Sequence, residues 1–189
     1  MVIKYMKLKK IKAGFYYLSN VKILIDKLNQ EAFPDKERLD TEIMFLLAKE
    51  NIIDILAIYL DEEFSGFFVI YPFRNLAYIS FFAICPGKRS TGLGSQALRL
   101  LREYYANSQI IVDFEAPNEN VSNNFQRIRR QKFYYKNNFF KTGWYQFYAE
   151  TEFEIACSEP EFDKTGFEAL IADIHVIAPE FNPHLYRKN

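Results

Sequence analysis

The chain has 189 residues, among them 24 basic and 24 acidic side chains, so its formal net charge is zero. Hydrophobic residues make up 49% of it and aromatic residues 17%, with only 7 glycines and 7 prolines, which excludes a disordered, collagen-like or low-complexity chain. A chain of this length buries roughly 70% of the surface that its unfolded form exposes, so it can fold without disulfides or a structural metal. It contains no apolar run of about 18 to 20 residues, and lysines interrupt its N-terminus, so we predict a cytoplasmic protein without a membrane partner.

Cysteine and histidine are too few for several kinds of active site. Cys85 and Cys157 lie in apolar, strand-like stretches, and His175 and His184 lie near the end of the chain. A zinc cluster needs about four ligands at close spacing, and a Ser/His/Asp or Cys/His site needs a histidine held beside its nucleophile. We therefore expect no metal. The neutral charge also argues against a nucleic-acid partner, because such proteins carry excess positive charge.

The first half of the chain predicts one strand, two helices and then three antiparallel strands. The expected ranges are 2–9 for the first strand, 21–31 and 38–50 for the helices, and 52–60, 64–71 and 76–84 for the later strands. Ser19 or Asn20 is the expected cap of the first helix. In the second helix, one face is expected to point inward, formed by Leu39, Ile43, Leu46 and Leu47. The 76–84 strand is apolar on both faces, so it should be central in the sheet.

The second half alternates helices and strands. Residues 85–96 lead into a helix. Its apolar positions fall at helical spacing, namely Leu93, Ala97, Leu100, Leu101 and Tyr104. We then expect a strand over 109–115, a basic helix over 123–136, and strands over 139–150 and 152–157. One amphipathic helix is expected over 163–176, followed by a tail rich in turn formers. This element order predicts an α/β (α+β) fold with a mixed, mainly antiparallel central sheet flanked by helices.

A glycine-rich turn, Arg-Ser-Thr-Gly-Leu-Gly at residues 89–94, opens directly into the helix after the 76–84 strand. The first amides of a helix have no partner within it, and the helix dipole adds partial positive charge there. Gly92 and Gly94 have no Cβ to obstruct a phosphate oxygen, and Lys88 and Arg89 add full charges at the rim. The spacing suits a pyrophosphate, but it is neither a Walker loop nor a dinucleotide motif, and an ordinary strand-to-helix turn is the alternative.

The run FAICPGKRSTGLGSQAL resembles the acetyl-CoA-binding motif of the GCN5-related N-acetyltransferase (GNAT) superfamily, Arg/Gln-x-x-Gly-x-Gly/Ala after a strand and Pro. Further along, KFYYKNNFF resembles the second family motif, an aromatic-Tyr pair followed by a turn and Phe. The resemblance covers residues 52–157 well and residues 1–51 only by element order. It departs from the family at Asn138, where a glycine is usual, and at Arg127, where a small polar residue is often found. It implies an acetyltransferase domain over residues 1–157, with a C-terminal helical extension over 158–189 packed on it or on the partner subunit of a homodimer.

The resemblance also implies acetyl-CoA as the acetyl donor. The cofactor-binding residues would lie at the end of the 76–84 strand, in the glycine turn and in the basic helix: Phe82, Ala83, Ile84, Lys88, Arg89, Ser90, Thr91, Gly92, Leu93, Gly94, Ser95 and Arg127. Backbone groups of residues 82–84, freed by a bulge or splay, would pair with pantetheine. The contact expected from the helix is made by the guanidinium of Arg127 or is absent.

Tyr134 occupies the family's general-acid position, and a packed aromatic at a helix end is the alternative role. A phenol with a pKa of about 10 can donate to a thiolate whose conjugate acid has a pKa of about 8.5 if it is well positioned. The proton acceptor is harder to assign, because residues 76–84 include no carboxylate. Asp113 and Glu115 share one face of the next strand, and Glu115 is the candidate base because it is nearer the strand's carboxyl end. Water, or an ion-paired structural role for these acids, is the alternative.

We therefore predict an acetyl-CoA-dependent N-acetyltransferase that acts on a primary amine of a small molecule or peptide by direct attack. A catalytically silent acyl-CoA-binding or interaction module of the same fold is the alternative, and an unrelated nucleotide-binding protein is a third reading. The sequence does not identify the acceptor. Several aromatic residues could line a pocket for an apolar or cationic amine, or could belong to the core or a dimer face: Tyr71, Phe73, Trp144, Tyr145 and Tyr148.

Overall fold

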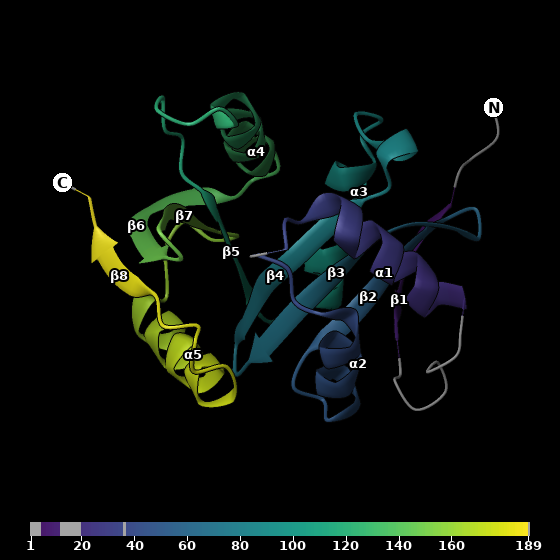
Figure 1. Ribbon diagram of the computed structural model, residues 1–189, viewed down its shortest axis with the longest axis horizontal. Coiled ribbons are helices and arrows are strands. Elements are labelled where there is room, and N and C mark those ends of the chain that lie inside the picture. The colour runs from purple at the N-terminus through teal and green to yellow at the C-terminus, as the bar shows by residue number, and fades with distance from the viewer. Residues whose placement is uncertain (1–4, 12–19, 36, 189) are drawn as a thin grey trace. The chain divides into compact units, whose positions relative to one another are not determined.

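The computed structural model describes residues 5–11, 20–35 and 37–188. The chain divides into two compact units, Met1–Pro72 with Ile79–Ala106 and Phe73–Tyr78 with Asn107–Asn189. Both units consist of sheet strands with flanking helices, and the sheet is mostly antiparallel, so the predicted mixed α/β class is confirmed (Figure 1). The predicted boundary between residues 157 and 158 does not coincide with the division into units and stays a prediction.

The first unit contains four neighbouring strands in chain order, β1 (Met6–Lys10), β2 (Asp54–Leu60), β3 (Glu63–Phe73) and most of β4 (Leu76–Ile84). Its helices are α1 (Asn20–Ala32), α2 (Thr41–Lys49), the short 3-10 helix Pro86–Lys88 and α3 (Leu93–Tyr104). Strand β2 runs antiparallel to both β1 and β3. The predicted strand bounds 76–84 are confirmed, whereas residues 2–4 and Ser19 lie outside the described residues.

The buried face of α2 differs from the predicted one. Its buried residues are Thr41, Met44, Phe45 and Ala48, whereas Ile43 and Leu46 are 47% and 48% exposed. The expectation was wrong because the run Ile-Met-Phe-Leu-Leu is apolar on every side, so the helical period does not distinguish one face from the other. Asp40 caps the helix, since its side chain accepts hydrogen bonds from the amides of Glu42 and Ile43, and the helix begins at Thr41 rather than at residue 38.

The second unit contains β5 (Gln109–Glu115), β6 (Phe140–Tyr148), β7 (Thr151–Cys157) and β8 (His184–Arg187), hydrogen-bonded in the order β5-β7-β6-β8. Every neighbouring pair of these strands is antiparallel. Its helices are α4 (Asn124–Lys136) and α5 (Lys164–Ile177), which lie on opposite sides of β5 and β7 in Figure 1. The first residues of β4 belong to this unit as well, and the Gln109 amide donates to the Asn75 carbonyl at 2.9 Å. Strand β4 therefore has neighbours on both sides, as a central strand should.

The C-terminal residues form a helix and then a strand. Helix α5 starts at a capping Asp163, whose carboxylate accepts from the Gly166 amide at 2.8 Å. It buries Phe167 and Leu170 completely, while Ile171 and Ile174 are half-buried. The sequence did not predict β8, because a strand of four residues among turn formers has too few positions to show a period of two. The strand pairs with β6 at the edge of the sheet.

Candidate functional site

The turn before α3 leaves open space in front of the helix. Gly92 is the N-cap residue, with a left-handed φ of 86°. A Cβ added at Gly92 would meet no heavy atom within 4 Å. Ser90 also has a positive φ, 63°, so the chain turns sharply twice before it enters the helix. This backbone course presents the start of α3 without a side chain in front of it.

The first amides of α3 are unpaired donors. Among the described residues, the amides of Leu93, Gly94 and Ser95 donate to no acceptor. The side chain of Leu93 is only 4% exposed, so this residue offers a ligand its amide and not its side chain. Unpaired amides at a helix N-terminus, together with the helix dipole, favour an anion such as a phosphate. The geometry of this turn can therefore bind one.

The two cations at this turn already have partners in their own chain. Nζ of Lys88 lies 2.9 Å from a carboxylate oxygen of Glu63. The guanidinium of Arg89 lies 2.6 Å from a carboxylate oxygen of Glu31, and its Nε donates to the Ile84 carbonyl at 2.9 Å. The hydroxyl of Thr91 donates to the Lys88 carbonyl at 2.8 Å. Backbone amides, rather than the side chains of Lys88 and Arg89, are thus the open donors of the turn.

The end of β4 packs closely against β3. Phe82 stacks on Phe68 with ring centroids 4.2 Å apart, and Ala83 is buried. A Cβ at Gly66 of β3 would lie 2.3 Å from the Ala83 carbonyl oxygen, so only glycine permits this approach. The bulge expected within residues 82–84 stays a prediction. A register shift lies instead in the neighbouring β2–β3 pair, between Ile58 and Tyr59.

Tyr134 lies on the buried side of α4, on the second unit. Its ring stacks on Phe114 of β5 with centroids 5.3 Å apart, and Phe139 packs edge-on at the same centroid distance. The residue is only 6% exposed, and among the described residues no hydrogen bond affects its hydroxyl. Burial raises the pKa of the Tyr134 phenol above its ordinary value, so the group is neutral and protonated. The phenol has a proton to donate and no acceptor for it among the residues that the structure describes.

Glu115 is tied into a network with the start of α4. One of its carboxylate oxygens lies 2.6 Å from the Arg127 guanidinium and the other 3.0 Å from that of Arg130. Asn123 donates to Glu115 at 3.2 Å, and Arg127 donates to the Asn123 side chain at 2.9 Å and the Ala116 carbonyl at 3.2 Å. Both oxygens of this carboxylate are therefore engaged by groups of the chain itself. The contacts of Glu115 and Arg127 match the structural alternative better than a base or a cofactor ligand.

Asp113 has a different environment from Glu115. Its carboxylate accepts hydrogen bonds from the Tyr78 hydroxyl and the Gln146 amide, both at 2.6 Å, and a longer one from the Tyr148 hydroxyl at 3.4 Å. No cation lies within ion-pair distance of it among the described residues. Burial raises the pKa of Asp113 above its ordinary value, against the opposing effect of these hydrogen bonds. Asp113 therefore holds a proton more readily than an ordinary aspartate.

Gln146 completes this cluster, and sequence analysis missed it. Its side chain is fully buried, and its carbonyl oxygen has no hydrogen-bond partner among the described residues. Tyr78 is likewise buried, with its ring edge-on to Phe167 of α5. The period of two indicated that Asp113 and Glu115 share a face. The sequence allowed an ion-paired role for either acid, but it did not indicate which acid would meet arginines and which would meet side chains from β4 and β6.

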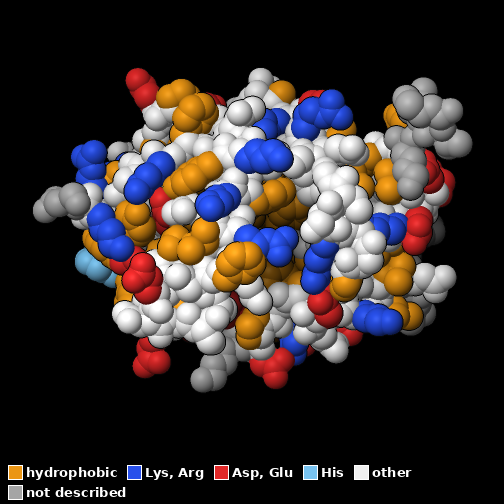
Figure 2. All heavy atoms as spheres, turned by 90° about the horizontal axis from the view of Figure 1, so that it is seen from above, with side chains coloured by type: hydrophobic (Ala, Val, Ile, Leu, Met, Phe, Trp, Pro, Cys, Tyr) orange, Lys and Arg blue, Asp and Glu red, His pale blue; other side chains and the backbone are white. Residues whose placement is uncertain are grey.

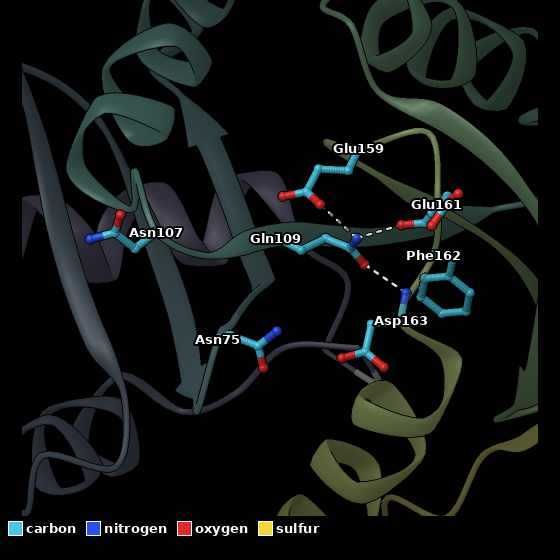
Figure 3. A pocket seen from close by; sticks show the side chains of 7 residues that line it. All are labelled: Asn75, Asn107, Gln109, Glu159, Glu161, Phe162 and Asp163. Carbon is cyan, nitrogen blue, oxygen red and sulfur yellow. Dashed lines mark hydrogen bonds between the residues drawn. The ribbon is translucent and has the colours of Figure 1, made fainter.

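A polar pocket of about 280 Å³ lies elsewhere in the second unit, lined by Asn75, Asn107, Gln109, Glu159, Glu161, Phe162 and Asp163 (Figure 3). The side-chain amide of Gln109 donates to the Glu161 carbonyl at 2.6 Å and accepts from the Asp163 amide at 3.1 Å. These bonds fix the segment that leads into α5. The pocket contains none of the predicted site residues. The side-chain amide of Gln109 is already hydrogen-bonded to the backbone of the chain.

Within residues 5–11, 20–35 and 37–188, no three His, Cys, Asp or Glu side chains are grouped so that they could hold a metal ion. No helix in these ranges is long and apolar enough to cross a membrane.

Comparison with known proteins gives a family and a set of similar folds. The model of the acetyltransferase (GNAT) family matches residues 21–138. A protein from Bacteroides thetaiotaomicron assigned to the GNAT acetyltransferases has a similar structure, with a TM-score of 0.72, 20% identity, and 92% of this chain and 98% of that chain covered. The ribosomal-protein-S18-alanine N-acetyltransferase from Escherichia coli gives a TM-score of 0.60 at 12% identity, covering 84% of this chain and 96% of that one.

A third structure was solved with acetyl-CoA bound. It is a GNAT family acetyltransferase from Elizabethkingia anophelis, with a TM-score of 0.54 and 13% identity, covering 82% of this chain and 97% of that chain. No curated protein matches the chain significantly. At these identities the structural neighbours show the shared fold.

Proposed function

Because the chain belongs to the GNAT acetyltransferase family, we propose that it transfers the acetyl group of acetyl-CoA to a primary amine of a small molecule or polypeptide. The observation that carries the proposal is the start of α3. The amides of Leu93, Gly94 and Ser95 have no acceptor among the described residues, and the space beside Gly92 is open. These groups fit the phosphates of the donor. A neighbour solved with acetyl-CoA bound supports the same donor. Cytoplasmic location and a homodimer stay predictions.

The chemistry needs two proton movements beside the transfer itself. When bound, acetyl-CoA supplies a thioester whose C–S bond breaks as a C–N bond to the amine forms. Tyr134 is the proposed donor of a proton to the departing sulfur, supported by its neutral phenol and by the lack of a hydrogen bond to its hydroxyl among the described residues. A phenol placed for this role contributes roughly 10²- to 10⁴-fold to the rate.

The second proton leaves the attacking amine, and we assign it to Asp113 in preference to Glu115. Asp113 has no cationic partner among the described residues, and burial raises its pKa above that of an ordinary aspartate. Both oxygens of Glu115 are within 3.0 Å of a guanidinium nitrogen. Water-mediated deprotonation is the competing route. Asp113→Asn and Glu115→Gln distinguish Asp113, Glu115 and water as the proton acceptor. Loss of the base lowers the rate of acetylation most at low pH, where the amine is protonated.

The test is turnover. Thiol release from acetyl-CoA is measured with a panel of small amines and peptides, first for the wild type and then for Tyr134→Phe. The proposal expects release that depends on the amine, and it is contradicted if CoA raises the melting temperature but no amine is acetylated. That second result would favour the silent acyl-CoA-binding module, which the absence of a carboxylate between residues 76 and 84 also permits.

A further inference from the structure

The exposed side of α4 carries an aromatic residue and three cations in one line. Phe125, Arg129, Lys132 and Lys136 are spaced at i, i+4, i+7 and i+11, so they share one face of the helix. All four are exposed, and Phe125 is 72% exposed. We call these four residues the α4 stripe. Figure 2 views the molecule from the side where α4 lies and shows Lys and Arg side chains there among hydrophobic ones.

The cations of the α4 stripe lack the carboxylate partner that two other cations of the same helix have. Arg127 and Arg130 both pair with Glu115. Arg129, Lys132 and Lys136 have no carboxylate within ion-pair distance among the described residues, and α4 contains no acidic residue. By contrast, Lys164 of α5 pairs with Glu168 four residues later. Like charges three or four residues apart repel each other, so the stripe is a surface whose charge the described residues leave unbalanced.

We propose that the α4 stripe docks an acidic segment of the polypeptide that carries the acceptor amine. This inference rests on the proposed acetyltransferase function and adds the class of acceptor. Carboxylates of the segment would pair with Arg129, Lys132 and Lys136, and an apolar residue would cover Phe125. Successive cations rise by about 4.5 to 6 Å along the helix, about 1 to 2.5 Å less than the roughly 7 Å between alternate side chains of an extended peptide, a difference that long Lys and Arg side chains can span.

The same charge pattern suits a polypeptide better than a nucleic acid. The chain as a whole has no net charge, so no overall positive field attracts a polyanion. Three phosphate contacts would give a salt dependence with a slope of only about −2 for a single strand, which means weak binding. Tyr134 lies on the same helix, between Lys132 and Lys136 in sequence, on its buried side. A segment docked on the α4 stripe is therefore held on the helix that carries the proposed proton donor.

The binding test uses a fluorescent Glu-rich peptide with one Leu and a blocked N-terminus, so that it cannot react. Anisotropy should show binding that weakens with salt, because exposed pairs are screened. Arg129→Glu/Lys132→Glu should weaken it by about tenfold or more. The matched control is Lys27→Glu/Lys49→Glu, which changes the net charge equally at exposed residues of α1 and α2 and should change affinity less than about twofold. Equal losses in both variants would overturn the proposal.

Competition experiments with two other ligands test whether the α4 stripe binds something other than an acidic peptide. If a single-stranded oligonucleotide of equal charge binds more tightly than the peptide, the α4 stripe binds nucleic acid and the proposal is wrong. Displacement of the peptide by CoA would likewise overturn it, since the stripe would then hold the phosphates of the donor. The proposal expects neither competitor to exceed the peptide or displace it.

Turnover distinguishes failure of this inference from failure of the proposed function. An acidic peptide with a free amine should have a higher kcat/KM than its Ser-for-Glu counterpart, and Arg129→Glu/Lys132→Glu should remove this preference by raising KM. Small-amine turnover should be unchanged in that variant. If small amines are acetylated but acidic peptides have no advantage, the docking proposal fails and the acetyltransferase stands. Acidic peptides that bind the stripe without any amine being acetylated would contradict the acetyltransferase and leave the docking surface.

Discussion

The start of α3 and the network around Glu115 both place charged side chains beside a helix N-terminus, yet they differ in what is left unpaired. At α3, Lys88 and Arg89 are paired while the amides of Leu93, Gly94 and Ser95 are open. Around Glu115, both carboxylate oxygens are occupied and Arg127 bonds to three separate groups. Unpaired donors that face open space can bind a ligand, whereas a fully paired network stabilises the fold.

The largest effect is expected from a carboxylate at the open turn. Gly92→Asp should abolish the rise in melting temperature that CoA gives the wild type, because the new charge lies where the phosphates bind. Gly92→Asn is the matched control, since Asn has the same shape, tolerates a positive φ and carries no charge. It should retain a measurable CoA shift. An undiminished shift in Gly92→Asp would remove the phosphate site from this turn.

Tyr134→Phe tests an unpaired donor of another kind. It keeps the ring stacked on Phe114 but removes the hydroxyl, so kcat should fall by about 10²-fold while CoA affinity stays unchanged. The neighbouring Tyr135 provides the contrast, because its hydroxyl donates to the buried Glu154. Tyr135→Phe should lower the melting temperature and leave kcat close to that of the wild type. Full turnover in Tyr134→Phe would exclude this residue as the acid.

Much of the frame around both regions follows from the sequence. The bounds of β4 and β5 agree with the predicted 76–84 and 109–115, because these strands are compact apolar runs ended by turn formers. The turn before α3 could also be predicted, because its glycines and the start of the helix are adjacent in the sequence. Local patterns of this kind specify the elements and the backbone course between them.

The pairings within the site depend on contacts distant in sequence, so local patterns could not supply them. Arg89 meets Glu31 and Lys88 meets Glu63, each across several elements. Gln146 reaches Asp113 from another strand. An ion-paired role was an alternative for both acids, but the sequence could not say which of them arginines would hold. That choice decides which carboxylate is left to accept a proton.

Glu115→Gln tests whether the paired network around Glu115 stabilises the fold. It leaves the guanidinium of Arg127 buried without its carboxylate, which should lower the free energy of unfolding by about 3 to 5 kcal/mol. Glu115→Leu/Arg127→Met, which removes both charges, should recover much of that loss. Denaturant unfolding of these variants measures both effects. A stable Glu115→Gln whose activity falls selectively at low pH would instead identify Glu115 as the base.

The smallest effect is expected at Asp113, in the pH dependence of stability. Because burial raises its folded pKa above that of about 3.9 in an unfolded chain, the folded protein binds the proton more tightly. The contribution of Asp113 to stability therefore falls as pH rises from about 4 through the raised folded pKa. Asp113→Asn does not titrate, so its stability relative to the wild type should increase over that window and then level off.

The side-chain amide of Gln146 adds a part of this effect that does not depend on pH. In Asp113→Asn the Gln146 amide can turn so that its unpartnered oxygen accepts from the new amide, which replaces, at every pH, the hydrogen bond that the Gln146 nitrogen donates in the wild type. Tyr78→Phe should raise the pKa of Asp113 further, because the Tyr78 hydrogen bond lowers it, and should therefore extend the window to higher pH. Urea unfolding at a series of pH values measures all three proteins. A difference between Asp113→Asn and the wild type that is constant with pH would mean that Asp113 does not hold its proton more tightly in the folded state, and the reason for preferring it to Glu115 as the base would be lost.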